Sequence, residues 1–386
     1  MNLLNKALNW ENNLRLWNII MLGINLRQNL KHLDWFLIIS SFLLTGLGLA
    51  VIFSSSLYKQ DFLNFQKQVG FLVLGIILML VFAFLDWRAF RDGPYLSITL
   101  YILCLLSLIG LLLFAPHIRG SRSWYRFGLI SIDPIEFTKL ILIILLAKYF
   151  STRHIELYRI RHILVSGLYI LFPIILILLQ PEVGSVIIMV LLWIGILLVS
   201  GIKLRHFLII CLCGLIVLVL SWSFLLKDYH KTRIVSFLFP QAQPLQAGWN
   251  QAQAKIAIGS GRLFGKGFSQ GTQIGYGFLP ASQTDFVYAG IVEEWGLVGA
   301  GLVLLCFTIL VWRLIKISLI SQSNFPRLFS AGLAIVIVIQ VGINIGMNLG
   351  LLPVIGIPLP LISYGGSSLI ATFIGLGIAQ SMKIKP

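Results

Sequence analysis

Charge is scarce in this sequence. Only 11% of its 386 residues are Asp, Glu, Lys or Arg, and 58% are hydrophobic, whereas about 25% of residues are charged in soluble globular domains. This composition excludes an ordinary soluble domain and predicts an integral membrane protein.

Acidic residues are the rarest charged group, with 13 against 29 Lys and Arg, which leaves a net charge of +16. The basic residues are spread over short connections between apolar runs, and they form no basic helix or aromatic-spaced patch. We therefore predict no nucleic-acid partner. Orienting charges in cytoplasmic loops and contact with anionic membrane lipids or substrates explain the basic residues better.

Cysteine and metal-ligand patterns are also scarce. The four cysteines lie in apolar runs without a CxxC pair, and the six histidines show no ligand spacing, so we expect neither a disulfide framework nor a zinc site. The run GSGRLFGKG is rich in glycine, but no Ser or Thr follows Lys266, which excludes a P-loop. We predict no organic cofactor.

Long hydrophobic runs dominate what is present. A bilayer-spanning helix needs about 20 apolar residues. Together the runs predict an all-α polytopic membrane protein with about ten transmembrane helices in a single domain, residues 35–386. The preceding residues 1–34 lack a long apolar core and predict a cytoplasmic amphipathic N-terminal segment. The predicted spans lie near residues 35–53, 69–85, 95–114, 134–150, 163–179, 184–201, 206–225, 286–312, 328–348 and 365–382.

The short connections orient these spans. With the N-terminus in the cytoplasm, the inner loops carry basic residues such as Arg88, Arg91, Arg153, Lys203 and Arg205, as the positive-inside rule requires. Both termini are then cytoplasmic, and we expect a cytoplasmic (inner) membrane location. A large extracytoplasmic loop, about residues 226–285, follows the seventh span. Its aromatic residues favour an ordered cap over a site rather than disorder.

Polar residues gather in the connections predicted to face outward. Asp133 and Pro134 are typical of a helix start, with Asp133 as N-cap and Glu136 closing a capping box. Lys139 lies one turn further in, where an ionisable residue is costly and is a functional candidate, although pairing with Glu136 would explain it structurally. Glu182, in a tight turn, is either a solvated turn residue or part of a site.

Asp285 closes the long loop, and it is either an N-cap of the eighth span or a functional carboxylate. Glu293 and Glu294 lie deeper in the same span, so at least one of them needs a protein or cavity neighbour. The last outer connection contains three prolines, and irregular backbone at membrane depth is tolerated only inside protein or beside a cavity. We therefore expect this connection to border the same cavity as the long loop.

Three stretches carry a family resemblance: AKIAIGSGRLFGKGFSQGTQ, FLPASQTDFVYAGIVEEWGLVG and NIGMNLGLLPVIGIPLPLISYGGSS. With them the chain resembles the SEDS family (shape, elongation, division and sporulation) of peptidoglycan glycosyltransferases. The wording GKGFSQGTQ is similar to the RodA branch of that family, which serves cell elongation and rod shape. The resemblance covers nearly all of the chain from residue 35 onward.

The resemblance implies a polymerase that joins lipid II, an undecaprenyl-pyrophosphate-linked disaccharide pentapeptide, into β-1,4 glycan strands. It implies Asp285 as the general base, a divalent cation (Mg or Mn) as a candidate to help stabilise the leaving pyrophosphate, and a class B penicillin-binding protein with the elongation machinery as partners. Two departures from the family pattern are Ser123 before Trp124, where an arginine is common, and Ala281 to Gln283 in place of a charged stretch. The candidates for substrate binding are Lys139, Glu136, Arg122, Trp124, Glu182, Arg262, Lys266 and Ser363.

Two alternatives to a polymerase stay open at this point. A lipid-linked precursor flippase would also show ten spans and intramembrane acids, although its key residues belong near the bilayer midplane. A membrane scaffold for a class B penicillin-binding protein is the other alternative, and it is compatible with an enzyme.

Overall fold

The computed structural model describes residues 32–115, 124–128, 130–153, 160–224, 228–239 and 247–385. Within these ranges the chain is almost entirely helical, as predicted, and the four cysteines are free thiols. The long helices are α3 (Trp35–Lys59), α4 (Leu63–Phe84), α6 (Leu96–Phe114), α7 (Pro134–Ser151), α8 (Ile160–Leu179), α9 (Val183–Ser200), α10 (Leu204–Phe224), α14 (Val287–Ile320), α15 (Asn324–Leu349) and α16 (Gly366–Ile384).

These long helices coincide in sequence with the ten predicted spans. By length and apolar composition, eight of the described helices can cross a membrane: α3, α4, α6, α8, α9, α14, α15 and α16. Of the other two, α7 carries Glu136, Lys139 and Lys148, and α10 is apolar over at least Leu204–Val217. The chain is a multi-pass helical membrane protein, and the count of ten spans stays a prediction.

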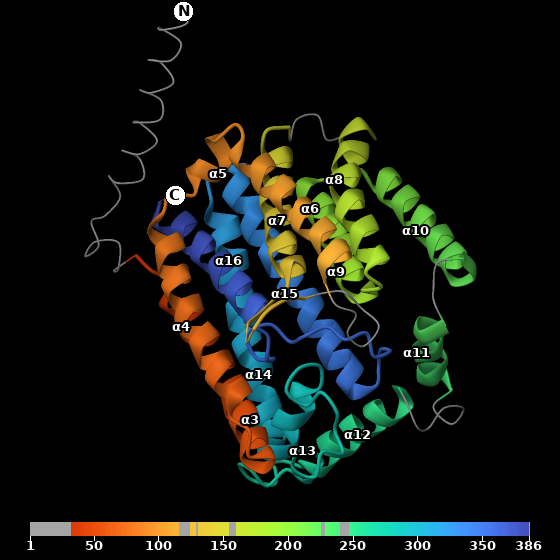
Figure 1. The fold of residues 1–386 in the computed structure, drawn as a ribbon. Helices are drawn as coiled ribbons and strands as arrows, with labels where there is room; N and C mark the ends of the chain where they lie inside the picture. Colours follow the sequence, from red (N-terminus) through yellow and green to blue (C-terminus); the bar gives the residue numbers. More distant parts are fainter. Residues whose placement is uncertain are drawn as a thin grey trace, which may run out of the picture.

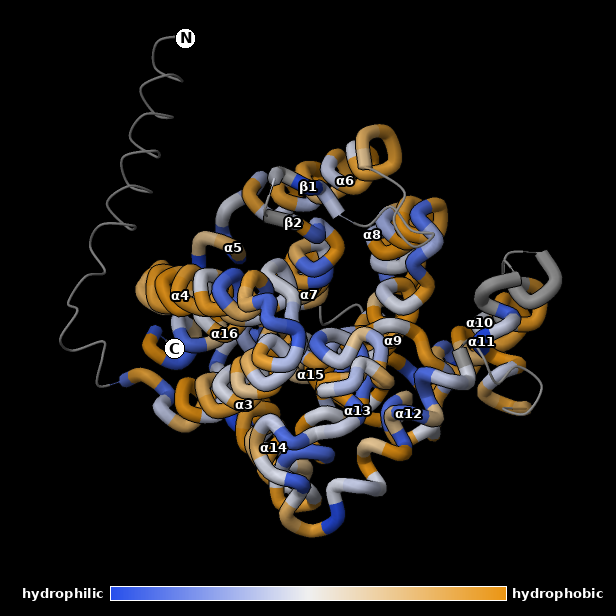
Figure 2. Tube along the Cα trace, turned by 60° about the horizontal axis from the view of Figure 1, so that its bottom comes forward, coloured by the Kyte–Doolittle hydropathy of each residue, from blue (hydrophilic) through white to orange (hydrophobic). Residues whose placement is uncertain are grey.

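The helices form a bundle with α7, α15 and α16 near its centre, where most of their side chains are buried (Figure 1). The short helix α5 (Arg88–Asp92) and the C-terminus lie at one end of the bundle. At the opposite end are α12 (Ala247–Ser260) and α13 (Thr272–Gly275). Viewed toward that second end, hydrophobic residues dominate the outer helix α4, whereas the connections around α13 contain many hydrophilic residues (Figure 2).

The long loop has more secondary structure than its sequence indicates. Its described part contains α11 (Asp228–Leu238), α12 and α13. A second unpredicted element is a small antiparallel hairpin of β1 (Tyr125–Phe127) and β2 (Ile130–Ile132), in which Tyr125 lies opposite Ile132. The hairpin comes directly before α7 and forms one side of the cavity described below.

The glycine-rich run packs into a break in α14. At Gly296 the backbone leaves the helical conformation, with φ 64° and ψ −156°. The amides of Lys266 and Gly267 donate to the carbonyl oxygens of Glu293 and Glu294, both at 3.0 Å. On the other side of the break, Leu297 and Val298 donate to loop carbonyls at 2.9 and 3.2 Å.

Glycine is required in this run because the two backbones approach so closely. A Cβ at Gly261 would lie 1.9 Å from the carbonyl oxygen of Val292, and one at Gly265 would lie 2.1 Å from that of Glu294. The glycines therefore serve backbone packing between the loop and α14.

Both acids of α14 are fully buried and have protein neighbours, as the sequence requires. Oε1 of Glu293 accepts hydrogen bonds from Lys266 Nζ at 2.7 Å and from the amide of Gln273 at 3.0 Å. Oε1 of Glu294 accepts one from the hydroxyl of Ser54.

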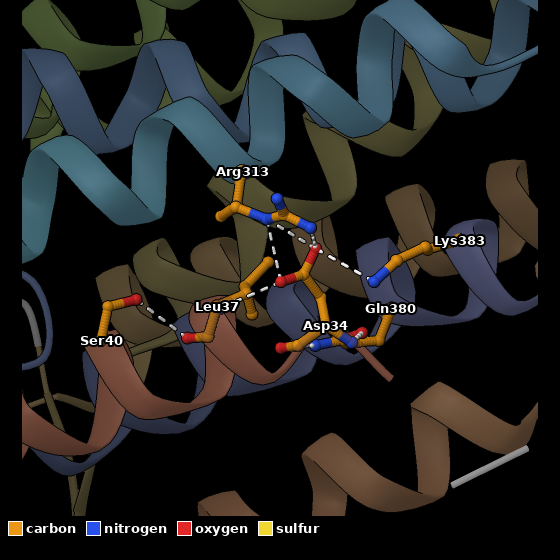
Figure 3. Close-up of polar contacts among 6 residues, drawn as sticks. All are labelled: Asp34, Leu37, Ser40, Arg313, Gln380 and Lys383. Carbon is orange, nitrogen blue, oxygen red and sulfur yellow. Dashed lines mark hydrogen bonds and ion pairs between the residues drawn. The ribbon is translucent and has the colours of Figure 1, made fainter. Parts of the chain in front are cut away.

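A buried ion cluster joins three helices near the end of the bundle that carries the C-terminus (Figure 3). Asp34, 1% exposed, caps α3 and accepts hydrogen bonds from Arg313 Nε of α14 at 2.9 and 2.8 Å. Lys383 Nζ of α16 lies 3.3 Å from its Oδ2. Gln380 completes the cluster, because it accepts from the amide of Asp34 and donates to its carbonyl oxygen.

Candidate active site

A cavity of about 1250 Å³ lies where the end of the long loop, the hairpin and the last outer connection meet. Residues 353–358 and 364–368 line it together with Arg233 and Asp285 from the long loop. The prediction that these two segments border one cavity is therefore confirmed. Further sides come from the ends of α3 and α4, from β1 and from the first turns of α7 and α9.

Asp285 is held in this cavity through its backbone. The Nδ2 atoms of Asn344 and Asn348, both fully buried on α15, each donate to the carbonyl oxygen of Asp285 at 3.0 Å. Asn344 also donates to the carbonyl oxygen of Ile357 at 2.8 Å, which joins α15 to the last connection. Because Phe286 occupies the N-cap position of α14, Asp285 does not cap this helix.

Ser363 hydrogen-bonds to the backbone of Thr284, the residue before Asp285. Its hydroxyl donates to the carbonyl oxygen of Thr284 at 2.5 Å and accepts from the amide of Leu359 at 2.8 Å. The side chain is 5% exposed and lies outside the cavity lining. Ser363 is thus a positioning residue in this geometry, although it was a candidate for substrate binding.

Gln283 replaces the charged residues that the family resemblance led us to expect before Asp285. Its Oε1 accepts from Asn64 at 2.8 Å, its Nε2 donates to Ser55 at 3.1 Å, and its carbonyl oxygen accepts from the amide of Tyr364. A neutral amide network therefore connects this turn to α3, α4 and the last connection.

The start of α7 contributes further charged groups to the cavity lining. Asp133 is the N-cap, as predicted, and its Oδ1 accepts from the amide of Ile135 at 2.9 Å. Glu136 does not reach back to close the predicted capping box, since the amide of Asp133 donates to Ser367 instead. Glu136 accepts from Lys139 Nζ at 2.7 Å, and only 4% of the Lys139 side chain is exposed.

Carboxylates crowd this part of the cavity. Glu182 is at the N-cap position of α9, its Oε1 accepts from Ser185 at 2.9 Å, and it lines the cavity. Burial, followed by the charges of Glu182 and Glu136, raises the pKa of Asp133 well above its usual value. Desolvation and like charges both disfavour a carboxylate, so this position favours the protonated acid.

The remaining candidates are placed as follows. Trp124 lines the cavity, as do Asp133 and Glu136. Arg262 and Lys266 belong to the glycine-rich run at the α14 break, and neither is part of the cavity lining. The side chain of Lys266 turns toward Glu293 instead. Arg122 lies outside the described residues.

Arg233 of α11 lines the cavity and was not among the candidates. In sequence it is one basic residue of a polar loop that also contains Lys231, Arg262 and Lys266, and no spacing rule singles it out. The sequence feature that could have indicated Arg233 is the partly amphipathic stretch after the seventh predicted span, which forms α11.

A resident metal site is not apparent in the described part of the chain, where no group of three His, Cys, Asp or Glu residues is spaced to hold an ion. The described residues therefore do not fit a resident divalent cation.

The chain resembles known proteins over almost its whole length. Residues 34–385 match the cell cycle protein family that is named after FtsW, RodA and SpoVE. The peptidoglycan glycosyltransferase MrdB of Escherichia coli strain K12 is 34% identical over 91% of this chain and 93% of its own length.

Two solved structures share the fold. A chain from a peptidoglycan synthase complex described as coordinating polymerization and crosslinking is 31% identical and has a TM-score of 0.77, with 91% of this chain and 97% of that one covered. The rod shape determining protein RodA of Thermus thermophilus is 30% identical, with a TM-score of 0.68 and coverage of 91% and 96%.

Proposed function

The chain belongs to the cell cycle protein family of FtsW, RodA and SpoVE, and we propose that it is a peptidoglycan glycosyltransferase that polymerises lipid II into β-1,4 glycan strands during cell elongation. The observation that carries this proposal is the placement of Asp285. Three buried side chains hold the carbonyl oxygens of Thr284 and Asp285, and the carboxylate of Asp285 lines a large cavity.

Asp285 acts as the general base of this reaction. The acceptor hydroxyl oxygen forms a bond to the anomeric carbon of the donor sugar while the bond from that carbon to the phosphate oxygen breaks. The electron pair leaves with the pyrophosphate, and the hydroxyl proton passes to the carboxylate of Asp285. A single displacement of this kind inverts the anomeric configuration.

The leaving pyrophosphate gains negative charge, which cations in the cavity stabilise. Lys59, Arg126, Lys139 and Arg233 line the cavity. The cavity thus combines a carboxylate with several basic groups at one end of an apolar helical bundle, which suits an amphiphile with an anionic headgroup.

A flippase is less well supported than an enzyme. Transporter sites typically lie near the membrane midplane in broken helices. Here Asp133, Glu182, Asp285 and Gly356 all lie in connections or at helix starts. The break in α14 is filled by the glycine-rich run and does not line the cavity.

The membrane orientation and the partner are part of the proposal. We place the protein in the cytoplasmic membrane with both termini in the cytoplasm and the cavity on the outer face, because α5 and the C-terminus lie at the opposite end of the bundle from the long loop (Figure 1). A class B penicillin-binding protein is the proposed partner, supported by the similarity to a chain of a peptidoglycan synthase complex.

Polymerisation of labelled lipid II by the purified protein, with and without the class B partner, tests the function. Asp285→Asn should abolish glycan strands while the protein still folds. The matched control is Asp92→Asn on α5, whose side chain is 58% exposed at the other end of the bundle. Glycan strands made by Asp285→Asn would reject the role of Asp285 as general base. Movement of lipid II across vesicles without any strands would favour the flippase.

The described residues form no resident metal site, so a role of Mg²⁺ or Mn²⁺ is tested in the same assay by removing divalent cations with EDTA and restoring each ion separately. An unchanged rate after EDTA treatment would reject this role.

A further inference from the structure

Arg233 enters the cavity from the long loop and is anchored by the last outer connection. It lies on α11, and its Nη1 donates to the carbonyl oxygen of Val354 at 3.0 Å. This bond ties α11 to the segment between α15 and α16. The guanidinium therefore has a defined position, which a flexible surface arginine lacks.

The side chains of Arg233 and Asp285 both approach Gly356. A Cβ added to this glycine would lie 3.7 Å from Oδ2 of Asp285 and 4.0 Å from Nη1 of Arg233. Gly356 has φ 80°, a left-handed conformation that a residue with a side chain rarely adopts. The connection thus presents bare backbone to both charged groups, which lie near the same side of Gly356.

Eight of the described residues that line the cavity are charged. Besides Arg233 and Asp285, the charged residues that line it are Lys59 of α3, Arg126 of β1, Asp133, Glu136 and Lys139 at the start of α7, and Glu182 before α9. Asp133 is influenced electrostatically by Glu182, Glu136 and Lys139. Burial lowers the pKa of Arg233, and the charge of Asp285 opposes that change. The phenol of Tyr364 also lines the cavity, and burial raises its pKa, so it is neutral at physiological pH.

We propose that Arg233 is the charge partner of Asp285: it orients the carboxylate in the cavity and keeps it ionised, ready to accept the proton of the acceptor hydroxyl. The inference rests on the proposed role of Asp285 as general base. An arginine suits this position because its guanidinium stays charged when it is buried and its planar fork fixes the direction of a carboxylate.

Loss of the positive charge has a specific consequence. Without a neighbouring cation, a carboxylate takes up its proton at a higher pH, typically by about 1 to 3 pH units. A base that is protonated at higher pH is inactive over a wider acidic range. The acidic limb of the pH–rate profile therefore moves upward, an effect that mere loosening of the loop would not produce.

The experiment measures the pH dependence of lipid II polymerisation for Arg233→Gln, Arg233→Lys and the wild type. Arg233→Gln should move the acidic limb upward by about 1 pH unit or more. Arg233→Lys should keep the limb near its wild-type position and lower kcat through lost orientation. Lys231→Gln is the control, because it removes a basic residue from the same helix that does not line the cavity.

An unmoved acidic limb in Arg233→Gln would overturn the inference, whereas activity in Asp285→Asn would overturn the proposed function beneath it. If Arg233→Gln is inactive at every pH, infrared spectroscopy decides instead. The protonated carboxyl band that Asp285→Asn removes should appear at higher pH in Arg233→Gln than in the wild type. The same titration in both proteins would reject the pairing.

Discussion

The side-chain amide of Asn344 holds the backbone of Asp285, with 3.0 Å between Nδ2 and the carbonyl oxygen. The same Nδ2 atom lies 2.8 Å from the carbonyl oxygen of Ile357. One buried amide on α15 therefore joins the proposed catalytic residue to the adjacent connection that also lines the cavity.

Replacing Asn344 with Leu should lower kcat more than it raises KM. The substitution leaves two buried carbonyl oxygens without this donor, which costs about 1–3 kcal/mol of stability, and Asp285 loses one of its two anchors. Initial polymerisation rates and thermal unfolding in detergent measure both effects. The control is Gln340→Leu, one turn away on α15, because Nε2 of Gln340 has no hydrogen-bond partner among the described residues. Equal effects of the two variants would contradict the positioning role.

The Lys139–Glu136 pair allows a test that separates binding from stability. Lys139→Met should destabilise the protein by about 3–5 kcal/mol, because it leaves Glu136 as a largely buried acid without its cation. The double variant Lys139→Met with Glu136→Gln should recover most of that stability. If Lys139 binds the donor, the double variant stays poor in lipid II polymerisation. Recovery of activity together with stability would show that the pair is only structural.

Asp133→Asn should stabilise the protein at neutral pH. Asn also caps helices well, and the change removes a carboxyl group whose pKa is raised by burial, Glu182 and Glu136. A raised folded-state pKa means that the native protein loses stability as pH rises through it. The advantage of Asn is therefore largest at high pH, on the order of a few degrees in Tm, and it disappears on acidification toward the unfolded pKa. Unfolding at pH 5 and pH 8 checks this, and an equal gain at both would contradict it.

Asp34→Asn should cost about 3–5 kcal/mol at neutral pH, since Arg313 and Lys383 lose their buried anion. Burial acts to raise the pKa of Asp34, but hydrogen bonds from Arg313 and Leu37, together with the charges of Lys383 and Arg313, outweigh it and lower the pKa. The stabilisation is thus complete above the ordinary pKa of 3.8 and is lost as pH falls through the lower folded-state pKa. Thermal unfolding against pH measures it. Asp92→Asn, which breaks an exposed pair, is the control and should change stability by at most about 1 kcal/mol.

Hydropathy and helix-start signals predict most of the fold. Transfer of apolar runs into lipid decides where helices such as α3 and α15 lie, and Asp133 followed by Pro134 predicts the start of α7 because capping is a local interaction. The helices of the long loop and the β1–β2 hairpin were missed, since their stability comes from packing against the bundle rather than from periodicity.

The site was predictable only in part. The family motif around Asp285 and its position at the end of the polar long loop indicate this residue. Glu136 and Lys139 are indicated by their spacing along a helix. Arg233 could not be selected, because what distinguishes it from Lys266 is tertiary: Lys266 turns toward Glu293, whereas Arg233 is anchored by Val354 beside Asp285. Asn344 and Asn348 were missed for the same reason, since a buried amide in an apolar helix has no visible partner in sequence.

The break in α14 also determines how force travels through the molecule. Two backbone hydrogen bonds join the glycine-rich run to α14 on each side of Gly296, so the run bridges the break in the helix. A displacement of the inner part of α14, where Arg313 is held by Asp34, reaches the outer part through the backbone of the loop as well as through the helix. The outer loop and α14 are therefore mechanically coupled. The glycines allow the close backbone contacts on which this coupling depends.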